Sequence, residues 1–84
     1  MMKVNIEEVE KKIVSVQYTK MGRKMTVCLI TVENGHEFIG QAGCVDPENY
    51  DLEIGSKWAY KDAFDKLVGA EAYLLQEKLN IDNE

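Results

Sequence analysis

The spacing of apolar residues near the N-terminus is typical of a short helix. Ile6, Val9 and Ile13 recur three and four residues apart, so that they share one face of a helix. Asn5 precedes them and can accept a hydrogen bond from the backbone at the helix start. We therefore predict an amphipathic helix over roughly residues 6–13.

The period then changes to two, which predicts β-structure. Apolar and polar residues alternate from Val14 to the sequence MGRK, and the run MTVCLITVE follows. Asn34-Gly35 is a strong signal for a type I′ hairpin turn, because that turn requires a positive φ at both central residues. HEFIGQAGC is then the third strand of an antiparallel meander.

A two-residue loop at this turn fixes a register between the second and third strands. The predicted pairs are Glu33 with His36, Thr31 with Phe38, Leu29 with Gly40, Val27 with Ala42 and Met25 with Cys44. Both faces of the second strand are apolar, and the small residues Gly40 and Ala42 leave room for helices on one face. The other face also needs a cover, either the N-terminal helix or a second subunit.

The C-terminal half predicts two helices. Asp46 is a candidate N-cap and Pro47 suits the first helical position, so the first helix would run to about Val68. Gly69 interrupts the pattern, and AEAYLLQEKL resumes it. The arc predicted to face the core contains Leu52, Ala59, Tyr60, Ala63, Phe64 and Leu67.

Together these elements predict an α+β fold in a single small domain, residues 1–84. A short N-terminal helix precedes the three-stranded antiparallel meander, and two C-terminal helices follow it. Ile54 and Trp58 fall opposite the core arc, where an exposed tryptophan beside an isoleucine indicates a contact surface. A chain of 84 residues buries a small core, which favours a homo-oligomer.

The net charge of −5 is unevenly distributed along the chain. Residues 1–24 hold most of the cations, whereas residues 25–56 hold acids and no Lys or Arg. We predict an electropositive and an electronegative end. This argues against binding along a nucleic acid, but leaves room for a compact anion.

The cations flank one glycine in the sequence YTKMGRKMTV. As an anion clamp, Lys20, Arg23 and Lys24 would supply charge, and Tyr18 or Trp58 would stack on a base. The other interpretation is a hairpin turn with solvated lysines. The glycine spacing matches neither the dinucleotide-binding nor the P-loop motif.

Other candidate chemistry is weaker. His36-Glu37 lacks the second histidine of a zinc motif, and Asp51 with Glu53 is explained by the start of a helix. Cys28 and Cys44 lie in apolar strands without a nearby base, so we interpret them as structural thiols that do not form a disulfide. We expect no catalytic residue, metal ligand or cofactor.

Residues 26–79 resemble a small phage and prophage family named after gene products forty-nine and sixty-six of two tailed phages. The resemblance lies in TVC at 26–28, the NG turn, Phe38, Gly40, CVDPENYD at 44–51, EIG at 53–55, AY at 59–60 and AYLL at 72–75. Val68-Gly69 stands where the family usually has Trp-Pro, so Trp58 is a candidate to replace that bulk. The basic KMGRK segment matches no part of the pattern.

The resemblance implies a small phage protein that modulates the host cell by binding. No signal peptide or membrane span is evident, so we expect it in the host cytoplasm. The first hypothesis is a non-enzymatic counter-defence protein that sequesters a small anionic nucleotide signal between subunits, through Tyr18, Lys20, Arg23, Lys24 and Trp58. The alternative is a protein-protein inhibitor of a host protein, acting through Ile54 and Trp58 or an acidic face.

Overall fold

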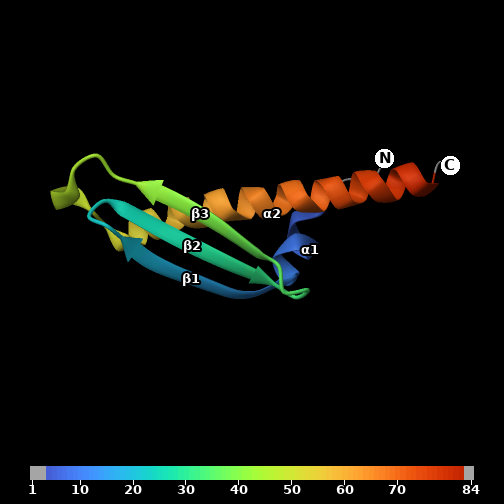
Figure 1. Ribbon diagram of the computed structural model, residues 1–84, viewed down its shortest axis with the longest axis horizontal. Coiled ribbons are helices and arrows are strands. Elements are labelled where there is room, and N and C mark those ends of the chain that lie inside the picture. Colours follow the sequence, from blue (N-terminus) through green and yellow to red (C-terminus); the bar gives the residue numbers. More distant parts are fainter. Residues whose placement is uncertain (1–3, 83–84) are drawn as a thin grey trace.

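The computed structural model describes residues 4–82 and contains one sheet and one long helix (Figure 1). The short helix α1 (Ile6–Lys11) leads into strands β1 (Ile13–Met21), β2 (Met25–Val32) and β3 (Glu37–Gly43). A 3₁₀ turn, η1 (Pro47–Asn49), then precedes α2 (Leu52–Asp82). The strands form an antiparallel meander in the order β1-β2-β3, as predicted. Figure 1 shows α2 crossing one face of the sheet and extending beyond it.

Helix α1 begins where the sequence indicates and ends two residues earlier than expected. The Asn5 side chain accepts hydrogen bonds from the N–H groups of Glu7 (2.9 Å) and Glu8 (3.3 Å), which confirms it as the N-cap. Val9 is the buried residue of this helix and belongs to the core beneath α2. Helix α1 therefore lies on the same side of the sheet as α2 and does not cover the outer face.

The predicted register between β2 and β3 is wrong by one residue. The loop contains three residues, Glu33 to Gly35, and Val32 N–H donates to His36 O (3.0 Å) at its base. Within this loop only Gly35 has a positive φ (92°), so the loop is not a type I′ turn. The observed pairs include Ile30 with Phe38, Cys28 with Gly40 and Thr26 with Ala42.

This register places Gly40 and Ala42 on the face of β2 that carries the buried residues. The alternating burial along β2 shows the same division, since every second residue from Thr26 to Val32 is buried. The fully or nearly fully buried apolar residues are Val9, Cys28, Ile30, Val32, Ala59, Ala63 and Leu67. Small residues on both sides let α2 pack closely on the sheet.

The two predicted C-terminal helices are one continuous helix, which corrects the predicted fold. Gly69 lies in the middle of α2, is exposed, and keeps a negative φ. A glycine in a helix costs about 1 kcal/mol relative to alanine, which weakens the helix without ending it. The start of α2 also differs from the prediction, because Asp46 and Pro47 start η1 instead. Asp51 caps α2, and its side chain accepts hydrogen bonds from Glu53 N–H (2.9 Å) and Ile54 N–H (3.2 Å). Leu52 is half exposed and outside the core.

Candidate functional site

The basic β1–β2 turn lies at the same end of the molecule as the connection from β3 to α2 (Figure 1). Gly22 opens the turn with φ 72°, a value that favours glycine, so the turn interpretation of this glycine is supported. Cys44 N–H donates to Lys24 O (3.0 Å), and Lys24 Nζ lies 3.4 Å from Val45 O. These contacts fix the turn against the connection.

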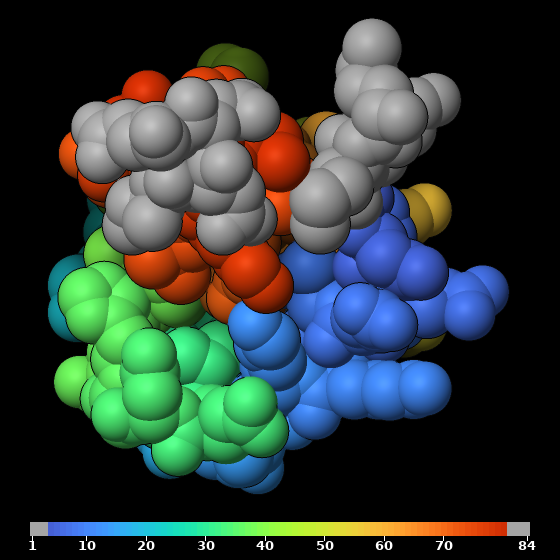
Figure 2. All heavy atoms as spheres, turned by 90° about the vertical axis from the view of Figure 1, so that its right-hand side faces the viewer, coloured from blue at the N-terminus to red at the C-terminus, as the bar shows by residue number. Residues whose placement is uncertain are grey.

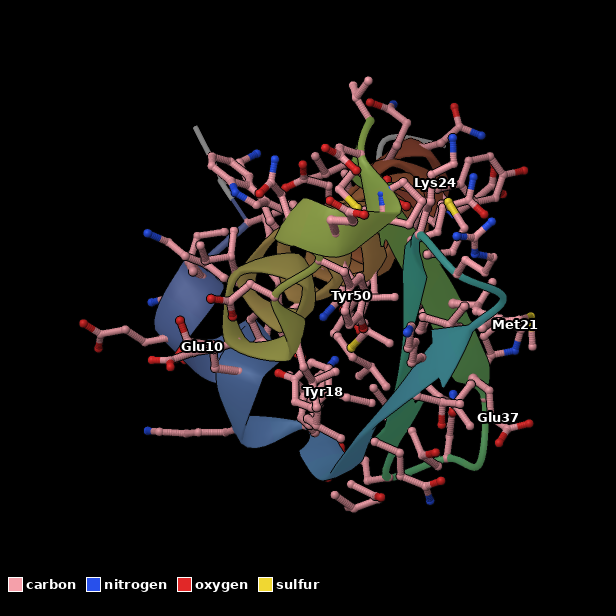
Figure 3. The ribbon with its side chains drawn as sticks, turned by 90° about the vertical axis from the view of Figure 1, so that its left-hand side faces the viewer. Glu10, Tyr18, Met21, Lys24, Glu37 and Tyr50 are labelled. Atoms are coloured by element: carbon pink, nitrogen blue, oxygen red, sulfur yellow. The ribbon has the colours of Figure 1, made fainter. Side chains whose placement is uncertain are left out.

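Lys20 lies beside Tyr50 at this end. Its Nζ is 4.6 Å from the centre of the Tyr50 ring, a cation-π distance. The Tyr50 hydroxyl shares a 2.9 Å hydrogen bond with the hydroxyl of the buried Thr26, which holds the ring in place beneath the start of α2. Figure 3 shows Tyr50 directed into the molecule between the sheet and α2. Tyr50 thus belongs to the same candidate site as Lys20. The sequence interpretation missed it, although it lies in the CVDPENYD segment.

A cavity of about 130 Å³ brings Lys24 and Trp58 together. Tyr50, Ile54 and Gly55 also line it, with the end of β3 on the other side. Trp58 and Ile54 are 54% and 58% exposed, which confirms the exposed pair predicted from the helical pattern. The cavity therefore combines one cation with aromatic and apolar groups.

The charges at this end are mixed, so the predicted separation into a positive and a negative end is wrong. Asp46 and Asp51 lie in the connection that packs against the basic turn, and both act as caps of backbone N–H groups. Arg23 is exposed at the tip of the turn. An anion here would meet Lys20, Arg23 and Lys24 against a nearby acidic segment.

Tyr18 lies on the other flank of α2 from Trp58. It pairs with Cys28 across β1 and β2, on the sheet face that carries α2. Burial raises the pKa of its hydroxyl, and the charge of Tyr18 in turn contributes to the raised pKa of Tyr60, whose main cause is also burial. Trp58 instead lines the cavity beside Ala42 and Gly43 of β3. Within one chain, the two candidate stacking residues do not form one pocket.

A larger cavity of about 380 Å³ lies near the β2–β3 turn, where no sequence motif indicated a site. His36 and Phe38 make an edge-on contact there, with ring centres 4.8 Å apart. The other lining residues are Val32, Asn34, Leu67, Ala70, Glu71, Tyr73 and Leu74. None of the described residues that line it is a lysine or an arginine, so it suits an apolar or aromatic group better than a phosphate. Figure 2 looks onto this end of the molecule, where α1 and the β2–β3 turn lie together beside α2.

The two cysteines differ in accessibility and are both free. Cys28 is fully buried in β2, and burial raises the pKa of its thiol. Cys44 is half-buried after β3, and its Sγ lies 3.3 Å from Asp46 O. The raised pKa disfavours the thiolate that a nucleophilic Cys28 would need.

We expect only Cys44 to react in the folded protein at pH 8. Alkylation by iodoacetamide, followed by mass spectrometry of the peptides, should label Cys44 at least about 100-fold faster than Cys28, because the thiolate must form and be reachable. Addition of denaturant should remove the difference. Equal labelling rates without denaturant would contradict the buried position of Cys28.

Within residues 4–82, no three His, Cys, Asp or Glu side chains are arranged to hold a metal ion. No helix among the described residues is long and apolar enough to cross a bilayer. The structure thus defines a small α+β domain with a helix-covered meander, a cation-aromatic cluster at one end and an apolar cavity at the other.

The chain belongs to the phage protein (N4 Gp49/phage Sf6 gene 66) family, whose model matches residues 4–79. This confirms the resemblance drawn from its motifs and extends it to α1 and β1. No curated protein and no solved structure matches the chain significantly.

Proposed function

We propose that this phage protein is a non-enzymatic accessory protein that counters host defence by sequestering a small nucleotide-type signal. The observation that carries the proposal is the cavity shared by Lys24 and Trp58, next to Lys20 on the Tyr50 ring. A lysine can hold a phosphate as a point charge, and an exposed indole can stack on a base. The phage family supplies the biological context.

The size of this cavity favours a site completed by a second copy. Sites for small molecules usually enclose about 300–1,000 Å³, more than the 130 Å³ found here. Tyr18, the remaining aromatic candidate, lies on the opposite flank of α2. A homo-oligomer can bring the Tyr18 of one copy toward the cations of another, whereas a single chain separates them.

The first test is thermal unfolding with a panel of cyclic dinucleotides, cyclic trinucleotides and ADP-ribose-type nucleotides. A ligand present at about 100 times its dissociation constant adds about 2.7 kcal/mol to the free energy of unfolding. For a domain of this size that amounts to a rise in Tm of roughly 10–20 °C. Native mass spectrometry of the same mixtures should show the bound mass.

Matched variants test whether the ligand binds at Lys20 and Lys24. Lys20→Ala with Lys24→Ala should weaken binding by at least about 10-fold, because two charge-assisted contacts are lost. Lys61→Ala with Lys78→Ala removes the same charge from exposed positions of α2 and should bind as the wild type does. If no nucleotide in the panel changes the Tm or adds mass, the sequestration proposal is rejected.

The exposed Ile54 and Trp58 favour the second candidate function, inhibition of a host protein by direct contact. Apolar side chains at this level of exposure are typical of protein-binding surfaces when they occur as a cluster. Pull-down from host lysate with the wild type and a folded Trp58→Asp variant separates the two functions. A protein captured only by the wild type, with no nucleotide effect on Tm, supports the inhibitor.

A further inference from the structure

The two edges of the sheet differ in how their backbone groups are satisfied. On β3, Gln41 N–H donates to Asp62 Oδ2 (3.0 Å), and Lys66 Nζ donates to Ile39 O (2.8 Å). Asp62 and Lys66 also form an ion pair with each other at 3.5 Å. Side chains of α2 therefore occupy the outward groups in the middle of β3 and prevent another strand from pairing there.

The β1 edge has outward backbone groups at alternate residues that make no hydrogen bond within residues 4–82, and the pairing with β2 identifies them. Val32 N–H bonds to His36 O, so the even-numbered residues of β2 face β3 and the odd-numbered residues face β1. Leu29 pairs with Gln17, so Gln17 faces β2 and its neighbours face outward. The outward N–H and C=O groups belong to Val16, Tyr18 and Lys20.

The usable length of this edge is limited on one side by a bulge and on the other by the turn. The register shifts between Ile13 and Ser15, which leaves Val14 as the extra residue. The regular run is therefore 15–21, without proline or glycine. Tyr18 is its central residue, and its own backbone groups point outward.

We propose that β1 pairs antiparallel with β1 of a second copy of this chain, about a two-fold axis at Tyr18. In this register Tyr18 faces Tyr18 of the second copy, and Val16 faces the second copy's Lys20 on either side of the axis. Each of these pairs exchanges two hydrogen bonds, so every open group of the edge is used. The contact is isologous and closes at two subunits.

The side chains fit this register. On the outer face, Gln17 faces Thr19 and Ser15 faces Met21, which places no like charges opposite each other. On the helix side, Glu10 lies close enough to Tyr60 to raise the pKa of that phenol, as Tyr18 does. Figure 3 shows Glu10 and Tyr18 on the same flank of the molecule. The second copy's Lys20 arrives beside Val16 on this flank and meets a carboxylate of opposite charge.

The resulting dimer has one six-stranded sheet with both α2 helices on the same side. Two copies of Tyr18 and two of Lys20 would line the groove between these helices. The inference stands on the two sheet edges and does not rest on the proposed ligand. A segment of another protein could add to β1 in the same way, and the experiment separates that case from self-pairing.

The experiment compares Val16→Pro with Val16→Ala by sedimentation velocity of the full chain without ligand. Because Val16 N–H points outward, proline at this position removes no bond to β2, whereas it removes two bonds of the dimer and adds two rings to the interface. We expect the wild type and Val16→Ala to be dimers. Val16→Pro should dissociate at least about 100-fold more readily. A wild type that stays monomeric up to about 100 µM would overturn the proposal and leave the edge to a foreign strand.

A cross-link decides the case even if Val16→Pro fails to fold. In the proposed register Gln17 and the second copy's Thr19 form a non-hydrogen-bonded pair with Cα atoms about 4.5 Å apart, which suits a disulfide. With Cys44→Ser as background, Gln17→Cys with Thr19→Cys should yield a covalent dimer on mild oxidation. Gln17→Cys alone should cross-link at least about 10-fold more slowly, because the two cysteines are then out of register. Equal rates, or a dimer that persists in a folded Val16→Pro variant, would refute this interface.

Discussion

Replacing Gly40 with alanine is expected to lower the free energy of unfolding by about 3 kcal/mol. A Cβ on Gly40 would overlap Ala59 O and Ala63 N, and would lie 2.8 Å from the Ala63 Cβ. Two of these three atoms are backbone atoms of α2, so no side-chain rotation relieves the overlap. The helix would have to move away from the sheet, and buried contacts around Ile30 and Leu67 would loosen with it.

Urea unfolding followed by circular dichroism measures this effect. Gly69→Ala is the matched control, because it makes the same chemical change in α2 where nothing lies within 4 Å of the new Cβ. That variant should gain about 0.5–1 kcal/mol, since alanine favours the helix. If Gly40→Ala is as stable as the wild type, the close packing of α2 on β3 is wrong.

The sequence predicts the order and type of the elements as far as β3 because each has a local cause. Asn5 caps α1, the period of two marks the strands, and Gly22 opens the turn of the first hairpin with a positive φ. The small size of Gly40 also predicts that a helix packs there. These features depend on neighbouring residues or on the volume of one side chain, and the structure confirms each of them.

The β2–β3 register could not be obtained in the same way. Asn34-Gly35 indicates a turn, but a two-residue loop and a three-residue loop can both contain this pair. The structure uses the longer loop. A shift of one residue in the register moves every side chain of the third strand to the opposite face of the sheet. The deciding factor is the packing of Phe38 and Gly40 beneath α2, which is a long-range contact.

Gly69 is a local signal that tertiary packing overrides. As a local signal it favours a break, yet the helix continues because residues on both sides of it pack against the sheet and α1. Long-range packing outweighs a cost of about 1 kcal/mol. The fold thus follows the predicted pattern except where tertiary contacts choose between two local solutions.

The sequence predicts several residues of the candidate site, but it does not predict how these residues are arranged in space. Lys20 and Lys24 lie at the same end of the molecule because Lys20 is near the end of β1 and Lys24 is in the turn that follows. The exposure of Trp58 follows from the helical period. Tyr50 joins them only because the connection after β3 folds back onto that turn. The separation of Tyr18 from Trp58 depends on where α2 crosses the sheet, which no local pattern specifies.

The second large effect concerns the two faces of the sheet. Ile30→Ala is expected to lower the free energy of unfolding by about 3–4 kcal/mol, because Ile30 is fully buried between the sheet and α2 and its removal leaves a cavity. Ile39 lies on the outer face, and its side chain is 57% exposed. Figure 3 shows Met21 and Glu37, on this same outer face, pointing away from α2.

Ile39→Ala makes the identical substitution and serves as the control. In an isolated subunit or an edge-paired dimer, the outer face remains in water, so the change should cost no more than about 0.5 kcal/mol. Urea unfolding at two protein concentrations measures both variants. A cost for Ile39→Ala close to that of Ile30→Ala, growing with protein concentration, would mean that a second subunit covers the outer face. Similar small losses for both variants would instead contradict the position of the core under α2.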